Sequence, residues 1–223
     1  MENVPVYISI AFGLTTLLTV WLFYRVSGNS LKTLLILLGW LMIQAKISSS
    51  GFYQVTNTIP PRFILMAPPA ILFIIGLFIT PMGRKYLDTL DVKGLTILHI
   101  VRIPVELILF SLFLYKVVPQ RMTFGGMNLD ILAGLSAPFV YYFGFVKHIL
   151  NTKVILIWNF ICLGLLINIV LNAAFSTPSP FQQFAFDQPN IVIFYFPFVW
   201  LPSFVVPIVF LSHLASIRKL IKS

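Results

Sequence analysis

Long apolar runs alternate with short polar segments along the whole chain of 223 residues. The seven runs cover residues 4–24, 33–51, 63–82, 95–118, 128–146, 154–175 and 190–213. Each is close to or above the ~18–20 residues that a helix needs to cross ~30 Å of hydrocarbon. The pattern therefore predicts an all-α polytopic membrane bundle of seven transmembrane helices. Since seven such helices take up ~140 residues, no connection can hold a soluble domain, and residues 1–223 are expected to form a single transmembrane domain.

Composition and charge agree with this class of protein. The chain is 59% hydrophobic and 9% charged, with a mean hydropathy of +0.97, far from the usage of soluble domains. Its net charge of +9 is unevenly placed. Ten basic residues fall on one side of the predicted helices: Arg25, Lys32, Arg84, Lys85, Lys93, Lys147, Lys153, Arg218, Lys219 and Lys222. Four fall on the other: Lys46, Arg62, Lys116 and Arg121. Because cytoplasmic loops carry the basic excess, we expect the N-terminus outside and the C-terminus in the cytoplasm, in a cell membrane of the bacterial inner membrane type. The expected partner is the lipid bilayer, anionic lipid included, and not nucleic acid.

Three ionisable residues lie in the fourth run at positions i, i+3 and i+7: His99, Arg102 and Glu106. At 100° per residue they share one helix face. Glu106 is then ~16 Å from the start of the helix, near the middle of the bilayer. An uncompensated charge there costs at least ~2.5–3.5 kcal/mol. The stripe must therefore face the interior of the bundle.

Two interpretations of this stripe stay open. Arg102 and Glu106 are four residues apart and can neutralise each other on their own helix, which would make the pair structural. Alternatively, the stripe lines a polar cavity, because ionisable residues within the membrane commonly mark ion and substrate pathways. Lys46 and Gln44 of the second run lie at a depth where they could meet Glu106. Further polar groups near this depth are Asn168 and Asn172 of the sixth run, whereas Asp130 is expected at the membrane interface.

No catalytic, metal or cofactor motif is recognisable. The single cysteine, Cys162, excludes disulfides and thiolate clusters within one chain. The three histidines, His99, His148 and His213, fall toward the cytoplasmic ends of their runs, where interfacial hydrogen bonding is the simplest interpretation. A retinal Schiff base would need a lysine in the last run, and residues 190–217 contain none. We therefore expect no metal and no cofactor.

Two segments resemble uncharacterised bacterial integral membrane proteins of about this length. The first runs from Met122-Thr123-Phe124-Gly125-Gly126 through Asp130-Ile131-Leu132-Ala133-Gly134-Leu135, and the second is Phe196-Pro197-Phe198-Val199-Trp200-Leu201-Pro202. The resemblance covers the last four predicted helices. It implies a seven-helix membrane protein and no particular function.

The sequence leaves three functional hypotheses. The first is a multi-pass protein that binds or translocates a small molecule or ion through a polar intramembrane cavity centred on Glu106 and Arg102, with bending supplied by the proline-rich third and seventh runs. The second is a non-transporting sensor, assembly factor or partner subunit. The third is a membrane enzyme acting on a lipid-like substrate, although the sequence favours a protein that is not an enzyme. A homo-oligomer is compatible with all three.

Overall fold

The computed structural model describes residues 4–222, and within this range it contains helices and no strand. The α-helices are α1 (Val6–Val26), α2 (Leu31–Ser49), α3 (Pro68–Ile79), α4 (Pro81–Thr89), α5 (Val92–Leu98), α6 (Arg102–Leu114), α7 (Ile131–Tyr141), α8 (Thr152–Phe175) and α9 (Val206–Lys222). Five 3₁₀ turns are η1 (Phe52–Gln54), η2 (Arg62–Met66), η3 (His99–Val101), η4 (Gln120–Met122) and η6 (Val192–Phe194). Two π-helical segments, η5 (Tyr142–Val146) and η7 (Leu201–Val205), continue α7 and precede α9.

Six of the resulting helical segments are long and apolar enough to cross a membrane. They are Val6–Val26, Leu31–Ser49, Arg62–Ile79, Val92–Leu114, Thr152–Phe175 and Leu201–Lys222. The all-helical class and its compatibility with a membrane are thereby confirmed. The fifth apolar run, expected over residues 128–146, forms only the shorter helix Ile131–Val146. Its 16 residues extend ~24 Å, less than the ~30 Å hydrocarbon core. The seven-span count and the orientation of the chain stay predictions.

Prolines divide the third run into separate helices. Pro68 begins α3 and Pro81 begins α4, positions where the missing N–H costs no helical hydrogen bond. Thr80 caps α4 by accepting a hydrogen bond from the backbone N–H of Gly83. The expected bending is therefore present, but as breaks between helices rather than as a kink within one.

The seventh run departs further from an uninterrupted helix. Its first part is the 3₁₀ turn η6 and a non-helical stretch, and the π-helix η7 then leads into α9, which continues to Lys222. Backbone groups in this irregular stretch bond to α2: Ser48 donates to the carbonyl of Phe194 at 2.8 Å, and the Trp40 indole donates to the carbonyl of Ser203 at 2.8 Å. Irregular backbone at membrane depth needs such internal partners because lipid offers none.

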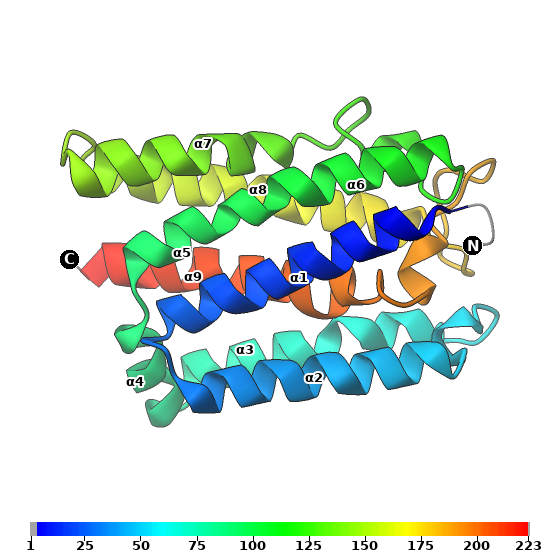
Figure 1. Cartoon of the computed structure of the whole chain (residues 1–223), viewed down its shortest axis with the longest axis horizontal. Helices are drawn as coiled ribbons and strands as arrows, with labels where there is room; N and C mark the ends of the chain where they lie inside the picture. The colour runs from blue at the N-terminus through cyan, green and yellow to red at the C-terminus, as the bar shows by residue number, and fades with distance from the viewer. Residues whose placement is uncertain (1–3, 223) are drawn as a thin grey trace.

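The helices form a bundle with α9 near its centre (Figure 1). The segment that contains α9 is the most buried of the six: 61% of its most apolar stretch is buried. The corresponding shares for the segments of α2 and α3 are 22% and 17%. On these peripheral helices large apolar side chains face outward, for example Leu35 at 60% and Met42 at 71% exposure. In an aqueous protein such surfaces would be unusually apolar, and in a membrane they contact acyl chains.

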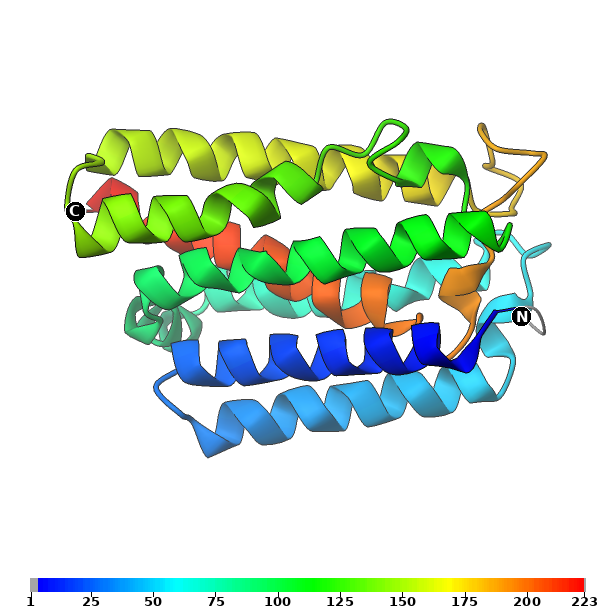
Figure 2. The ribbon, with the colours of Figure 1, turned by 45° about the horizontal axis from the view of Figure 1, so that its top comes forward.

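The connection between α6 and α7 enters the bundle instead of remaining at its end. The ribbon turns back after α6, and α7 begins partway along α8 (Figure 2). Asn128 is fully buried and Asp130 is 5% exposed. This re-entry explains why α7 is short, and it delivers two polar side chains to the interior.

Candidate functional site

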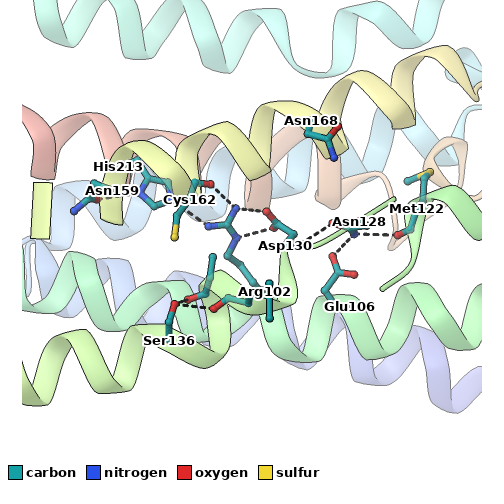
Figure 3. A network of polar contacts seen from close by, with 12 residues as sticks. Arg102, Glu106, Met122, Asn128, Asp130, Ser136, Asn159, Cys162, Asn168 and His213 are labelled. Atoms are coloured by element: carbon teal, nitrogen blue, oxygen red, sulfur yellow. Dashed lines mark hydrogen bonds and ion pairs between the residues drawn. The ribbon is translucent and has the colours of Figure 1, made fainter. Parts of the chain in front are cut away.

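A bidentate ion pair between Arg102 and Asp130 is buried inside the bundle (Figure 3). The Arg102 Nε donates to Asp130 Oδ2 at 2.6 Å, and Nη2 donates to Oδ1. Both side chains are almost fully buried, with 3% and 8% exposure. Planar, two-pronged contact of this kind is the strongest form of arginine–carboxylate recognition.

This geometry corrects two expectations from the sequence. Asp130 is not exposed, as an interfacial residue would be, but buried among the helices, because the connection before α7 carries it inward. Arg102 pairs with Asp130 and not with Glu106, although Glu106 is four residues away on the same helix. A carboxylate approaching from another segment can meet the guanidinium fork in its plane.

Arg102 makes two further hydrogen bonds. Its Nη2 donates to the backbone carbonyl of Cys162 on α8 at 3.1 Å, and its Nη1 lies 3.1 Å from Nε2 of His213 on α9. Because an arginine donates only, Nε2 of His213 is the acceptor. The side chain thus joins α6 to the start of α7, to α8 and to α9.

The remaining contacts of His213 fix its form. Its Nδ1 lies 2.9 Å from Oδ1 of Asn159, and the Asn159 amide nitrogen already donates to the carbonyl of Ile155. With Nε2 accepting and Nδ1 donating, the ring is the neutral Nδ1–H tautomer. Fully buried His213 and His99 stack with centroids 3.8 Å apart and planes at 16°.

Two of the three histidines therefore differ from the interfacial arrangement expected from the sequence. His99 and His213 lie inside the bundle, and neither ring nitrogen of His99 has a hydrogen-bond partner. His148 is exposed, in the connection between α7 and α8, with a φ of 54°. The stacked pair comes from helices far apart in sequence, so helix spacing could not reveal it.

Glu106 follows Arg102 by four residues on α6, whereas His99 precedes it, and Glu106 is 1% exposed. Its Oε1 accepts a hydrogen bond of 2.5 Å from the Asn128 amide, which also donates to the carbonyl of Met122. Its second carboxyl oxygen, Oε2, is buried without a partner. Asn128 Oδ1 accepts from the backbone N–H of Asp130 at 3.0 Å, so Asn128 links the Glu106 carboxylate to the backbone at Asp130 (Figure 3).

The other predicted site residues lie apart from this cluster. Gln44 accepts a hydrogen bond from the Tyr53 hydroxyl at 2.8 Å, and Lys46 is exposed. The expectation that they meet Glu106 is therefore wrong: α2 lies at the edge of the bundle. Asn168 donates to the carbonyl of Met127 at 3.0 Å, and Asn172 accepts from Arg121 Nε at 3.1 Å. These two asparagines hold the re-entrant connection against α8.

The cluster is thus composed of the predicted His99, Arg102 and Glu106 together with four residues that the sequence did not assign to it: Asn128, Asp130, Asn159 and His213. One signal was available for Asp130, which lies near the start of the fifth apolar run and directly before the first residue of α7, a common place for a helix-capping aspartate. In the structure Asp130 makes no side-chain capping bond, because Arg102 occupies its carboxylate.

Among residues 4–222 no group of three or more His, Cys, Asp or Glu side chains is arranged to hold a metal ion. Comparison with family models, with curated proteins and with solved structures found no match for this chain. Its function must therefore be inferred from the site itself.

Proposed function

We propose that this is a multi-pass membrane protein, of the bacterial inner membrane, that binds or moves a small ion at the cluster around Arg102. The simplest such ion is a proton. The observation that carries this proposal is the contrast between saturated and unsaturated groups. Arg102 makes four hydrogen bonds, whereas Glu106 and His99 retain buried polar atoms without partners.

Unpartnered buried groups of this kind are costly. Leaving one donor or acceptor unsatisfied costs ~1–3 kcal/mol, and folded proteins contain few of them. They cluster at catalytic, binding and ion-conducting sites more than elsewhere. Glu106 can take a proton on Oε2 while Oε1 keeps its bond to Asn128, and neutral His99 can take one on the ring nitrogen that carries no hydrogen.

The ion pair makes the position between these two groups suitable for a cation. Arg102 lies between His99 and Glu106 in the sequence, and its positive charge would repel a passing cation if it were unpaired. Asp130 neutralises it at hydrogen-bond distance. His99 and Glu106 are seven residues apart, ~10 Å along the helix, so an ion would need intervening water to pass between them.

Proton movement in proteoliposomes tests the proposal. The purified protein is reconstituted with an internal pH-sensitive dye, and a pH gradient is imposed with valinomycin and potassium to balance charge. We expect faster equilibration than in empty liposomes and loss of this activity in Glu106→Gln. The substitution keeps an oxygen for the Asn128 bond but removes the site for the proton.

The control is Asp187→Asn, which also removes one carboxylate, from an exposed position. It should behave as the parent protein does. Size-exclusion profiles and helical circular dichroism report whether both variants fold. A parent protein no more active than empty liposomes, or a folded Glu106→Gln protein with the parent's rate, contradicts the proposal.

A second candidate is a non-transporting membrane component. The observation in its favour is that Arg102 bonds to groups on three other parts of the chain, as a structural clamp would. This alternative predicts no proton movement above empty liposomes. It also predicts that folding is retained when the whole pair is replaced by apolar residues, as in Arg102→Met with Asp130→Leu.

A further inference from the structure

A groove opens between α7 and α8 on the outer surface of the bundle, with a volume of about 430 Å³. This volume falls within the ~300–1,000 Å³ of small-molecule sites. Its rim is apolar and exposed: Leu132 and Phe139 of α7 are 52% and 64% exposed, and Ile161 of α8 is 60% exposed. We propose that the groove holds an acyl chain of an anionic phospholipid, whose head group is bound by Lys147 and Lys153.

The position of the groove selects a membrane lipid over a water-soluble ligand. Its α8 residues run from Trp158 to Leu165 within a helix of 24 residues. They therefore begin ~9 Å from the start of α8 and end ~20 Å from it, in the middle of a ~30 Å hydrocarbon core. A molecule reaching this groove sideways must already be dissolved in the membrane.

Charge at one end of the groove selects the head group. Lys147 directly follows η5 and Lys153 is the second residue of α8, on the two sides of the short connection between these helices. Both are exposed, and neither forms an ion pair within residues 4–222, although Lys147 lies 5.8 Å from the Tyr142 ring. Two unpaired lysines at the membrane surface attract a phosphate or another anionic group.

The distance between lysines and groove matches one lipid chain. Lys153 precedes Trp158 by five residues, ~8 Å along the helix, and Lys147 follows Phe139 by eight, ~12 Å. An acyl chain in one leaflet spans half of the ~30 Å core, ~15 Å. A lipid whose phosphate lies between the lysines therefore places the middle and end of its chain in the groove.

The groove also borders the buried cluster. The Trp158 indole donates to Ser136 at 2.9 Å in the groove wall, and its ring packs against that of His99 at 72°, with centroids 5.5 Å apart. A bound chain would thus rest against the residue that covers the stacked histidines. The inference does not depend on ion movement, since it concerns binding at a different surface.

The test uses phosphatidylglycerol that carries a photoactivatable diazirine within one acyl chain. The full-length protein is irradiated in nanodiscs of phosphatidylcholine with a small fraction of the probe, and labelled residues are located by mass spectrometry. We expect labelling concentrated on α7 and α8 between residues 132 and 165, and its loss when unlabelled phosphatidylglycerol is added in excess.

Two kinds of variant separate the chain site from the head-group site. Leu165→Trp fills the groove and should reduce the competed labelling by about tenfold or more. Lys147→Gln and Lys153→Gln should each weaken it by about fivefold, the effect of one basic residue near an anionic surface. The controls Leu35→Trp and Lys85→Gln change an exposed apolar and an exposed basic position elsewhere and should leave the labelling unchanged.

Three results would overturn the proposal. One is labelling of equal strength on α2 and α3, which indicates bulk lipid contact. Another is competition by phosphatidylcholine or by free palmitate as effective as that by phosphatidylglycerol. The third is a cross-linked dimer through α7 and α8 that excludes the probe, which identifies a second copy of the chain as the occupant.

Discussion

Asp130 meets Arg102 inside the bundle although 28 positions separate them in the sequence. The contact depends on the connection before α7 folding inward, because a conventional loop would leave Asp130 at the membrane surface. The pair therefore reports on the position of the whole re-entrant segment as well as on local charge. Replacing either partner should affect both.

Asp130→Asn should destabilise the protein by ~3–5 kcal/mol, because it leaves the Arg102 guanidinium buried without the negative charge that neutralises it. Thermal unfolding in detergent, followed by circular dichroism, measures the effect. The double variant Arg102→Met with Asp130→Leu should recover part of this stability, since an apolar pair of similar volume needs no compensation. A double variant less stable than Asp130→Asn would contradict this account.

Gly134 allows α7 to approach α6 closely behind the ion pair. A Cβ there would lie 2.9 Å from Ile103 Cγ1, 3.1 Å from the Ile103 nitrogen and 3.3 Å from Arg102 Cβ. Gly134→Ala should therefore lower the melting temperature, with a cost of ~1–3 kcal/mol from overpacking.

Gly164→Ala on α8 is the control. Nothing lies within 4 Å of a Cβ added at Gly164, so the higher helix propensity of alanine should stabilise the protein by up to ~1 kcal/mol. Equal effects of the two substitutions would show that close packing at Gly134 is unimportant.

The helical class, most spans and the burial of the charged stripe can be predicted because they depend on local properties of the sequence. These properties are the length of each apolar run and the energetic cost of placing a charge in the membrane. His99, Arg102 and Glu106 could be assigned to one inward face because helix geometry fixes their relative direction. All three are indeed buried.

The partners of this stripe could not be predicted in the same way. Asn128 and Asp130 reach the cluster through an irregular connection, whose path follows from tertiary packing and not from periodicity. His213 and Asn159 belong to helices whose rotation about their axes the sequence does not define, since apolar residues surround them on all sides. Proline and aromatic content in residues 195–202 indicated irregularity, but not that the backbone there would bond to α2.

Two tryptophans join α2 to the irregular backbone before α9. Trp200 Nε1 donates to the Leu41 carbonyl at 3.0 Å, and Trp40 donates to that of Ser203. Trp40→Phe should cost ~0.6–1.7 kcal/mol, as other interhelical hydrogen bonds in membranes do, and should speed amide hydrogen exchange over residues 194–205. Trp21→Phe, a surface substitution on α1 at a 56% exposed residue, should leave the exchange unchanged. Slow exchange retained in a combined Trp40→Phe, Trp200→Phe protein would show that the contacts do not hold this segment.

The C-terminal end of α9 is tied to α4 by a pH-sensitive contact. A hydrogen bond from Arg218, supported by Lys222 and by the charges of both, holds the pKa of the Asp88 carboxyl below its ordinary value. The stabilising form is therefore the carboxylate. The stabilising contribution of this contact is complete above the ordinary pKa of ~4 and is lost as the pH falls through the lowered pKa of the folded protein.

Melting temperatures from pH ~7 down to ~3 should show a drop in the parent that is smaller in Asp88→Asn, since the substituted amide cannot titrate. The control Asp187→Asn should follow the parent curve, whereas identical curves for the parent and Asp88→Asn would exclude this contact as a source of acid sensitivity.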